Sequence, residues 1–429
     1  MQALEIKRCR ACDSNKLIGV ISLGEHYISD FIELNGNPGT KVPLDLVLCE
    51  DCKLLQLKHN APNESMWGGN YWYKSGINSV IMSDLKDIVS KTEKLVNLNS
   101  GDLVLDIGCN DGTLLGFYDK EGIFLAGFEP SKNVASEAAK KGFIIINDYF
   151  NADSFRRNFG GKKVKVITAI SMFYDLENPN KFLDDISECL DENGLFIIQQ
   201  NYLVSMLEQN AFDNICHEHR EYYSFHSLAR LLNRHDMEIF DVELNDINGG
   251  SIRTYIRKKS NSRITPFTGA LKRISRIIEK EDEIKLDSLT PYTEFAKRIN
   301  LLKETLLKFI RIEKKKGRIF GLIGASTRGN TLLQYFGLTH NEIAAASEAN
   351  PDKFGRYTVG SMIPIMPVEE VKKIKPDYMV VLIWHLFEGL MEKEKNFLKE
   401  GGKFILPLPD FRIIEHSFDF DRLMVKKFL

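Results

Sequence analysis

The sequence lacks the features that would assign the protein to a membrane or a nucleic acid. It has no run approaching the roughly 18 apolar residues that a membrane-spanning helix needs. Its 57 Lys and Arg residues stand against 59 Asp and Glu residues, which leaves a net charge of -2 and no basic surface for nucleic acid. We therefore expect a soluble protein without nucleic-acid or membrane partners. The first residues also lack the apolar segment of a secretory signal, which predicts a cytoplasmic protein.

The length predicts more than one domain. At 429 residues the chain exceeds what one hydrophobic core usually serves. A small unit with little apolar sequence of its own is predicted over residues 1–65, and a second domain over residues 66–258. Residues 259–290 are polar and charged, and we interpret them as a linker with helical pieces. The third predicted domain therefore comprises residues 259–429, linker included.

Four of the seven cysteines form two Cys-x2-Cys pairs. Such pairs present four thiolates that can close tetrahedrally on one zinc ion, and a site of four thiolates leaves no open position for a water molecule. Metal is favoured over disulfides in a reducing compartment. The sequence therefore predicts a structural zinc ion, without a catalytic role, held by Cys9, Cys12, Cys49 and Cys52.

Short apolar segments alternate with helical patterns along most of the chain, which is typical of an α/β protein with a parallel sheet covered on both faces. The expected strands of the central domain are residues 103–108, 123–130, 143–148, 165–173 and 194–201. Residues 237–246 and 251–259 predict an antiparallel pair that closes this sheet. In the C-terminal region we expect a helix from Thr290–Pro291 to Gly317 and strands at 318–326, 341–348, 378–385 and 403–410. The fold class is thus two Rossmann-like α/β regions behind a zinc-binding domain.

A glycine-containing turn, Asp106-Ile107-Gly108-Cys109-Asn110-Asp111-Gly112, follows the first of these strands. Glycines let the backbone approach a ligand closely, and the helix expected after the turn offers its N-terminal amides to a negative group. Glu129, at the end of the next strand, is placed to accept hydrogen bonds from ribose hydroxyls. Together these features resemble a class I methyltransferase. The resemblance implies that S-adenosylmethionine is bound by Asp106, Gly108, Cys109, Asn110, Gly112 and Glu129.

The segment His217-Glu218-His219 follows the last apolar strand of the central sheet. Two imidazoles beside a carboxylate, with Tyr222 and Tyr223 close by, suit a site that abstracts a proton near neutral pH. A metal site is an alternative, although the sequence offers no third ligand at a metal spacing. A plain surface cluster of histidines is the other alternative.

The order of these motifs resembles the sugar C-methyltransferases of deoxysugar biosynthesis over nearly the whole chain. The resemblance rests on the two cysteine pairs, the Tyr-x-Tyr-x-Ser segment at 71–75, the turn at 106–112, the His-Glu-His segment, Asn248-Gly249-Gly250-Ser251-Ile252-Arg253 and the glycine loop at 324–338.

The resemblance implies a three-domain enzyme that uses S-adenosylmethionine to methylate a carbon of a 4-keto-6-deoxy sugar carried on a nucleoside diphosphate. In such enzymes a proton beside the ketone is removed and the resulting enolate is methylated. His219 is then the implied base, Glu218 its partner, and Tyr71 or Tyr73 a donor to the keto oxygen, with Tyr222 nearby. The implied substrate-binding residues are Asn248, Gly250, Ser251, Arg253, Ser326, Arg328 and Asn330.

Three positions depart from the family pattern. Cys216 stands where the family usually has a tyrosine, so that role is lost or passes to Tyr222. Arg328 replaces the common lysine of the C-terminal loop, and its guanidinium can still grip a phosphate. Trp384-His385 replaces Trp-Asn. These changes lie where the substrate is expected, so they bear on the identity of the sugar and of the methylated carbon.

Two other functions remain open from sequence alone. The methyl group could go to a hydroxyl, an amine or a small molecule without a nucleotide. Alternatively, the protein could be a non-catalytic binding protein whose zinc pairs and glycine loops are structural only. The intact turn at 106–112, together with Glu129, argues against the second of these. The sequence does not indicate the oligomeric state.

Overall fold

The computed structural model describes residues 3–67, 71–387, 389–390 and 394–415, and its internal contacts group the chain into two units. Unit 1 comprises residues 1–20, 46–204 and 218–289, and unit 2 comprises residues 21–45, 205–217 and 290–429. Residues 1–2 and 416–429, the ends of the first and third predicted domains, lie outside the described part. The three-domain division stays a prediction.

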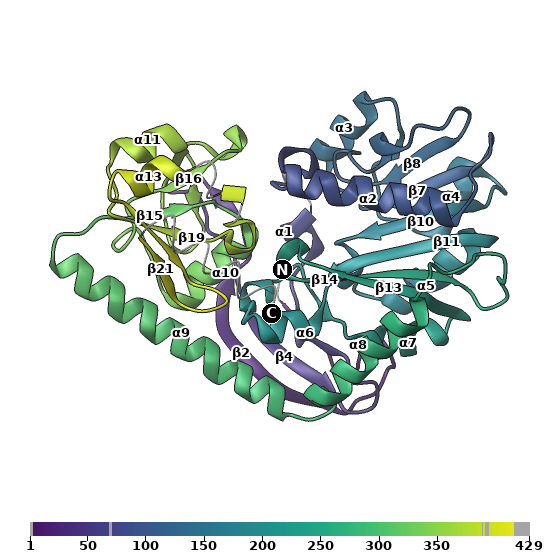
Figure 1. Cartoon of the computed structure of the whole chain (residues 1–429), viewed down its shortest axis with the longest axis horizontal. Helices are drawn as coiled ribbons and strands as arrows, with labels where there is room; N and C mark the ends of the chain where they lie inside the picture. Colours follow the sequence, from purple (N-terminus) through teal and green to yellow (C-terminus); the bar gives the residue numbers. More distant parts are fainter. Residues whose placement is uncertain (1–2, 68–70, 388, 391–393, 416–429) are drawn as a thin grey trace. The chain divides into compact units, whose positions relative to one another are not determined.

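Unit 1 is built on a seven-stranded sheet with the order β13-β14-β11-β10-β7-β8-β9. Only β14 runs antiparallel to its neighbours, so the expected antiparallel pair and the parallel α/β sheet are both confirmed. The strands are β7 (Leu103–Ile107), β8 (Phe124–Phe128), β9 (Ile144–Ile146), β10 (Val164–Ile170), β11 (Leu190–Asn201), β13 (Met237–Asn245) and β14 (Ser251–Lys258). Figure 1 shows β8, β7, β10 and β11 side by side in this unit.

Helices cover both faces of this sheet because the side chains of each strand alternate between two cores. On β7, Leu103, Leu105 and Ile107 pack into a core with α4 (Ala152–Phe159), α5 (Pro179–Cys189) and α7 (Phe225–Asn233). Val104 points to the opposite core, which is formed with α2 (Ser79–Leu95). A further helix, α3 (Lys132–Lys140), connects β8 and β9.

The helix expected directly after the glycine turn is absent from its place. The chain forms only a short 3-10 turn, η2 (Leu115–Phe117), before Gly122. Gly116, which lowers helix propensity, lies in the middle of this short connection, and a connection of that length leaves no room for several turns. In the described residues up to Gly122 no helix N-terminus follows the turn, and the amides of Gly108, Cys109 and Gly112 donate to backbone carbonyls within the protein.

The predicted linker contains one substantial helix, α8 (Ala270–Ile284), which is fastened to unit 1 by a buried ion pair. Arg273 Nη2 lies 2.6 Å from Asp241 Oδ1 and 2.7 Å from Oδ2, and Asp241 is fully buried on β13. At the other end of α8, the buried Glu281 accepts hydrogen bonds from Tyr202 Oη and from the amide of His226 at the start of α7. A carboxylate at a helix N-terminus is favourable, so α8 also stabilises α7.

Unit 2 is built on a six-stranded sheet with the order β18-β16-β15-β19-β20-β21, in which only β21 is antiparallel. Its strands are β15 (Phe320–Ile323), β16 (Ala346–Glu348), β18 (Ile365–Pro367), β19 (Tyr378–Val381), β20 (Lys403–Leu406) and β21 (Arg412–Ile414). Its helices include α9 (Thr290–Lys315), α10 (Thr327–Phe336), α11 (Val368–Lys373) and α13 (Lys395–Lys399). The expected long helix and parallel strands are confirmed, but the strand expected at 341–348 comprises only its last three residues. Thr339 and Glu342 form a hydrogen-bonded turn that occupies the first part.

A four-stranded sheet with the order β12-β5-β4-β2 joins the cysteine segment to the segment after His-Glu-His. Its strands are β2 (Leu17–Tyr27), β4 (Lys41–Cys49), β5 (Leu55–Leu57) and β12 (Glu221–Tyr222). The remaining elements are β1 (Leu4–Glu5), β3 (Phe31–Ile32), β6 (His59–Asn60), β17 (Tyr357–Thr358), α1 (Asn63–Trp67), α6 (Leu203–Glu208), and the short turns η1 (Ser75–Ile77), η3 (Phe173–Asp175), η4 (Phe212–Asn214), η5 (Ile247–Gly249), η6 (Pro351–Lys353) and η7 (Trp384–Leu386). Among the described residues, no helix has both the length and the apolar character needed to cross a bilayer.

The substitution Arg273→Ala should destabilise unit 1 strongly. It would leave the fully buried carboxylate of Asp241 without its cation, and because the Arg273 side chain is 32% exposed, the expected cost is that of one buried acceptor losing its partner, about 1 to 3 kcal/mol. Urea unfolding followed by circular dichroism measures the change. The exposed neighbour Arg276 on the same helix provides the control, since Arg276→Ala should shift the midpoint little. Equal midpoints for the two variants would contradict the anchoring role of Arg273.

Candidate functional site

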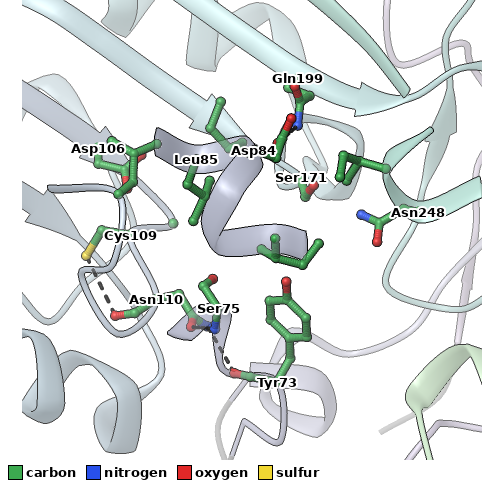
Figure 2. Close-up of a pocket in the computed structure, with 15 residues that line it drawn as sticks. Tyr73, Ser75, Asp84, Leu85, Asp106, Cys109, Asn110, Ser171, Gln199 and Asn248 are labelled. Carbon is green, nitrogen blue, oxygen red and sulfur yellow. Dashed lines mark hydrogen bonds between the residues drawn. The ribbon is translucent and has the colours of Figure 1, made fainter. Parts of the chain in front are cut away.

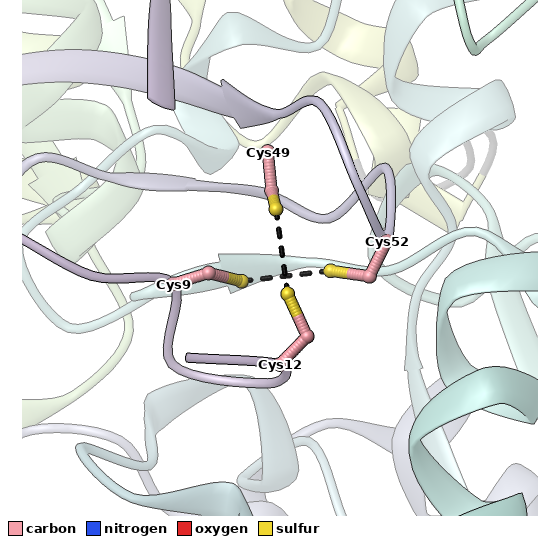
Figure 3. Close-up of side chains that lie close together, drawn as sticks. All are labelled: Cys9, Cys12, Cys49 and Cys52. Carbon is pink, nitrogen blue, oxygen red and sulfur yellow. Dashed lines mark hydrogen bonds between the residues drawn. The ribbon is translucent and has the colours of Figure 1, made fainter. Parts of the chain in front are cut away.

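The four paired cysteines of unit 1 converge on one point (Figure 3). The Sγ atoms of Cys9 and Cys52 lie 3.5 Å apart, as do those of Cys12 and Cys49, and all four lie within 4.8 Å of one another. Each pair lies in a tight turn that is closed by a backbone hydrogen bond from the residue after the pair. The Asp13 amide donates to the Cys9 carbonyl, and the Lys53 amide donates to the Cys49 carbonyl. All seven cysteines are free of disulfides.

This donor set fits zinc. Four Zn–S bonds of about 2.3 Å in a tetrahedron place the sulfurs roughly 3.8 Å apart, close to the spacing of the two pairs. Gln56 Nε2 donates to Cys9 Sγ at 3.1 Å, an interaction of the kind that orients a metal ligand. The predicted ligands are thus assembled as expected. Zinc held here would crosslink two chain segments and would supply no chemistry.

The glycine turn after β7 lines a pocket at the carboxyl ends of the central strands (Figure 2). Gly108 has a φ of +70°, and a Cβ on it would meet the Met172 side chain at 3.1 Å, so glycine is required there. Of the predicted residues, those that line the pocket are Tyr73, Asp106, Gly108, Cys109, Asn110 and Asn248. The thiol of Cys109 packs over Gly127 of β8, and the Cys109 amide donates to the Phe128 carbonyl at 3.1 Å.

Glu129 supports the turn from the end of β8. Its Oε2 accepts a hydrogen bond from the Asn110 amide at 3.0 Å, and its Oε1 accepts one from the Ser131 amide at 2.8 Å. Burial raises the pKa of Glu129, and burial together with the charge of Glu129 raises the pKa of Asp106 to about 7. Asp106 accepts a hydrogen bond from Thr168 Oγ1 at 2.6 Å. Glu129 and Gly112 are not among the pocket-lining residues, so the contact of Glu129 with ribose hydroxyls stays a prediction.

Sequence reasoning missed several residues that line the pocket. They are Ser75, Ile81, Asp84, Leu85, Leu114, Ile170, Ser171, Gln199 and Ile247. One indication was available: Gln199 and Gln200 end the apolar strand β11 with two polar residues at the sheet edge where ligands bind. Asp84 gave no comparable indication, because an acidic residue in an amphipathic helix normally faces solvent.

The two histidines of the His-Glu-His segment have different environments. His217 belongs to unit 2 and is buried, with Nε2 2.9 Å from the carbonyl oxygen of Val42. Burial lowers its pKa to about 4, so His217 stays neutral and donates to that carbonyl. One nitrogen of His217 is therefore occupied by a structural hydrogen bond, so His217 itself is poorly suited to bind a metal.

Glu218 and His219 belong to unit 1 and lie beside the turn η3 at the end of β10. The ring of His219 meets the ring of Tyr174 edge-on, with the centroids 4.4 Å apart. The next residue, Arg220, donates its amide to the carbonyl oxygen of Tyr174 at 2.8 Å and its Nη1 to that of Asp175 at 2.9 Å. Burial raises the pKa of Glu218 to about 7. The segment is thus held rigidly, and its carboxyl group can exchange a proton near neutral pH.

Three tyrosines were predicted for the active site. Figure 2 shows the Tyr73 ring extending into the pocket with its hydroxyl foremost. Burial of that hydroxyl raises the pKa of Tyr73 to about 12, although part of its ring is exposed. The pKa of Tyr71 is raised further by burial and then by the charges of Glu218 and Asp175. Both phenols therefore remain hydrogen-bond donors at neutral pH. Tyr222 is buried in β12.

The predicted substrate residues around β14 divide into one that lines the pocket and others that do not. Asn248 lines it, while Ser251 donates its hydroxyl to the Ile247 carbonyl and Gly250 forms the preceding turn. Arg253 is only 1% exposed, with Asp84 and Asp87 each 2.7 Å from its guanidinium. This position favours a supporting role for Arg253 over direct contact with a substrate.

Ser326, Arg328 and Asn330 lie in unit 2, in the loop after β15 and the first turn of α10. Ser326 caps α10 by accepting the Gly329 amide, and the fully buried Asn330 donates to the Asp30 carbonyl. Arg328 Nη2 lies 2.7 Å from Asp213 Oδ2, which also accepts a hydrogen bond from Trp384 Nε1. The charge of Arg328 is thus already balanced by a carboxylate.

Models of three protein families match successive parts of the chain. A zinc-binding domain matches residues 9–67, a methyltransferase domain matches residues 82–242, and a C-methyltransferase C-terminal domain matches residues 246–409. The order of the three matches is the order of the predicted cysteine, glycine-turn and C-terminal regions.

Individual proteins are similar to the chain over different shares of its length. The C-methyltransferase NovU of Streptomyces niveus is 29% identical over 422 residues, which cover 95% of this chain and 97% of NovU. Among solved structures, magnesium protoporphyrin IX methyltransferase of Synechocystis aligns with 14% identity and a TM-score of 0.33 over 43% of this chain and 87% of its own. A methyltransferase of Clostridium acetobutylicum that depends on S-adenosylmethionine aligns with 15% identity and a TM-score of 0.34 over 41% and 91%.

Replacing one zinc ligand should remove the metal. In Cys12→Ser the site keeps three thiolates, and the expected result is a loss of most of about one equivalent of bound zinc, with a lower melting temperature. Mass spectrometry of the purified protein for metal content measures this. Cys189→Ala, in the core against α5, is the matched control and should keep its zinc. A fully loaded Cys12→Ser variant would contradict the assignment.

Glu218→Gln should make the protein more stable at alkaline pH. Burial raises the pKa of Glu218 from 4.5 in the unfolded chain to about 7 in the folded protein. The free energy of unfolding is therefore highest below pH 4.5, where the group is protonated in both states, and falls as the pH rises through 7. The loss amounts to about 3 kcal/mol, and a glutamine does not incur it.

Urea unfolding at pH 4.5 and pH 8 tests this prediction. The variant should match the parent at the lower pH and exceed it at the higher pH. Glu279→Gln, at an exposed position on α8, should show no such difference. A Glu218→Gln variant less stable than the parent at pH 8 would mean that the carboxylate has a stabilising partner.

Proposed function

We propose that this S-adenosylmethionine-dependent C-methyltransferase, whose parts match a zinc-binding domain, a methyltransferase domain and a C-methyltransferase C-terminal domain, methylates a carbon next to the ketone of a nucleotide-linked 4-keto-6-deoxy sugar. His219 removes the proton from that carbon, and Glu218 is its partner. The alternative of a non-catalytic binding protein is thereby set aside.

One observation carries this proposal. The strand end and turn formed by residues 170–175 supply Ile170 and Ser171 to the pocket wall and, three residues later, the ring of Tyr174 to His219. A base held this near the methyl-donor pocket suits a reaction in which deprotonation and methylation take place at one carbon.

The side chains around the pocket can serve that chemistry. A proton beside a ketone becomes removable when a base is in place and a donor stabilises the enolate oxygen. Tyr73 suits this donor role better than Tyr71, since its hydroxyl lines the pocket and stays protonated at neutral pH. Glu218, with its pKa near 7, can take up the proton that His219 receives. S-adenosylmethionine, when bound, supplies an electrophilic methyl group.

The nucleotide part of the substrate has a candidate partner in unit 2. The loop Ser326–Asn330 follows β15 and opens α10, a common place for phosphate. A phosphate bound there would have to share Arg328 with Asp213, because that ion pair is already formed. We therefore propose that Arg328 contacts the diphosphate while Asp213 fixes its orientation.

Reaction in deuterated water tests the proposal. The protein is incubated with S-adenosylmethionine and a panel of nucleoside-diphosphate 4-keto-6-deoxy sugars, and products are identified by mass spectrometry. We expect a methylated sugar, and deuterium at the same carbon when the methyl donor is omitted. His219→Ala should lose both by at least about 100-fold, because general base catalysis is worth roughly that much, while its affinity for S-adenosylhomocysteine stays unchanged.

A matched histidine variant controls for general damage. His340→Ala changes an exposed imidazole and should retain full turnover. If His219→Ala also retains turnover, His219 is not the base. If no sugar in the panel is methylated or deuterated by the parent protein, the acceptor belongs to another class.

A further inference from the structure

One corner of the pocket is acidic and is built from three elements. Asp84 of α2 and Gln199 of β11 both line the pocket, and Arg253 of β14 lies behind them. Figure 2 shows Asp84 and Gln199 next to each other at one end of the pocket. No sequence motif indicated Asp84, and the methyl-transfer chemistry proposed above does not use this corner.

The geometry of the acidic corner is tightly defined. Asp84 Oδ1 accepts a hydrogen bond from Arg253 Nη2 at 2.7 Å, and Asp84 Oδ2 accepts one from Gln199 Nε2 at 2.5 Å. Gln199 is oriented in turn, since its Oε1 accepts from Arg253 Nε at 2.7 Å and from Asn245 Nδ2 at 2.9 Å. A carboxylate can accept about four hydrogen bonds, so each oxygen of Asp84 retains capacity for a donor from the pocket.

The charges around Arg253 do not cancel. Arg253 and Lys91 provide two positive charges, whereas Asp84, Asp87 and Glu243 provide three negative ones, which leaves one negative charge. Of the three carboxylates, Asp84 is the one that lines the pocket. Asp84 is also the one of the three whose side chain is buried, and a cationic group on the ligand would stabilise its charge.

The order of the strands gives the ligand a direction. Strands β8, β7, β10 and β11 are neighbours, and they present Glu129, Gly108, Ser171 and Gln199 at their carboxyl ends. With strands about 4.8 Å apart, Glu129 and Gln199 are separated by about 14 Å along the sheet edge. A ligand with its ribose at Glu129 therefore extends its other end across Gly108 toward the acidic corner.

We propose that Asp84 binds the α-ammonium group of the methionine part of S-adenosylmethionine, and that Gln199 and Arg253 are positioning residues that hold the Asp84 carboxylate toward it. The ammonium is the cationic group at the end of the cofactor opposite the adenosine. Burial raises the pKa of both Asp84 and Asp106, but Asp84 has the Arg253 guanidinium beside it, which favours its charged form.

Two ligands that differ only in the amino-acid tail test the proposal. S-adenosylhomocysteine carries the ammonium, whereas 5′-methylthioadenosine has the same adenosine and sulfur but no amino acid. Their dissociation constants are measured by titration calorimetry on the full chain. In Asp84→Asn the affinity for S-adenosylhomocysteine should fall by roughly 10- to 100-fold, as expected for the loss of one hydrogen bond to a charged group. The affinity for 5′-methylthioadenosine should stay within about twofold.

Asp87→Asn is the matched control, since Asp87 pairs with the same arginine but does not line the pocket. It should leave both affinities nearly unchanged. The proposal is overturned if Asp84→Asn weakens both ligands equally, which would indicate a general distortion of the pocket, or if it weakens neither. Melting temperatures of the variants identify any loss of fold. No acceptor sugar enters the experiment, so its outcome is independent of the proposed sugar substrate.

Discussion

The pairing of β12 with β5 is the constraint on which the candidate active site depends. Glu221 lies opposite Gln56, Tyr222 lies opposite Leu55, and the Leu57 amide donates to the Arg220 carbonyl at 2.8 Å. Strand β5 starts three residues after Cys52, and the Gln56 side chain reaches Cys9 Sγ. Because β12 directly follows His219 and Arg220, the cysteine site fixes where the His-Glu-His segment ends. The cysteine segment is too small to form a core of its own, but through β5 and β12 it helps to position the His-Glu-His segment.

Burial gives the pocket and its surroundings an unusual electrostatic character. It raises the pKa values of Asp84, Asp106 and Glu218, and the last two reach about 7. Each of these carboxyl groups is costly to ionise without a cation nearby. A cofactor that carries a sulfonium and an ammonium group supplies that compensation. Cofactor binding and ionisation of these acids should therefore favour each other, whereas product release is eased once the methyl group and its sulfonium charge are gone.

Features with a local cause could be predicted from the sequence, whereas features that depend on contacts between distant residues could not. The alternation of apolar strands with helices, the cysteine quartet and the turn at Gly108 each have a local cause. The strand expected at 341–348 and the helix expected after Gly112 were wrong, because a side-chain turn at Thr339 and a short connection with Gly116 overrode the pattern. The predicted roles of the individual site residues stay predictions, and the structure adds where each one lies.

Asp84 illustrates why part of the pocket was beyond the reach of sequence. Its position in α2 is that of an ordinary polar residue, and only the fold sets it against Arg253 of β14, 169 positions along the chain. The resemblance to the sugar C-methyltransferases implied that Arg253 contacts the substrate. In the folded protein Arg253 forms ion pairs with two aspartates, and one of these carboxylates, not the guanidinium, lines the pocket. The sign of the charge offered to a ligand is thus reversed by a contact that no local pattern encodes.

The end of β10 joins the two halves of the proposed reaction. Ser171 has a φ of +55°, and its amide donates to the Gln199 carbonyl at 2.7 Å, so the chain turns sharply where it leaves the sheet. That turn puts Ser171 in the pocket wall, and the following turn η3 places Tyr174 against His219. Since only two residues separate Ser171 from Tyr174, the distance between pocket wall and base is set by local backbone geometry. A short connection suits this reaction, because the methyl donor and the base must each stay within about 1 Å of the position in which they react.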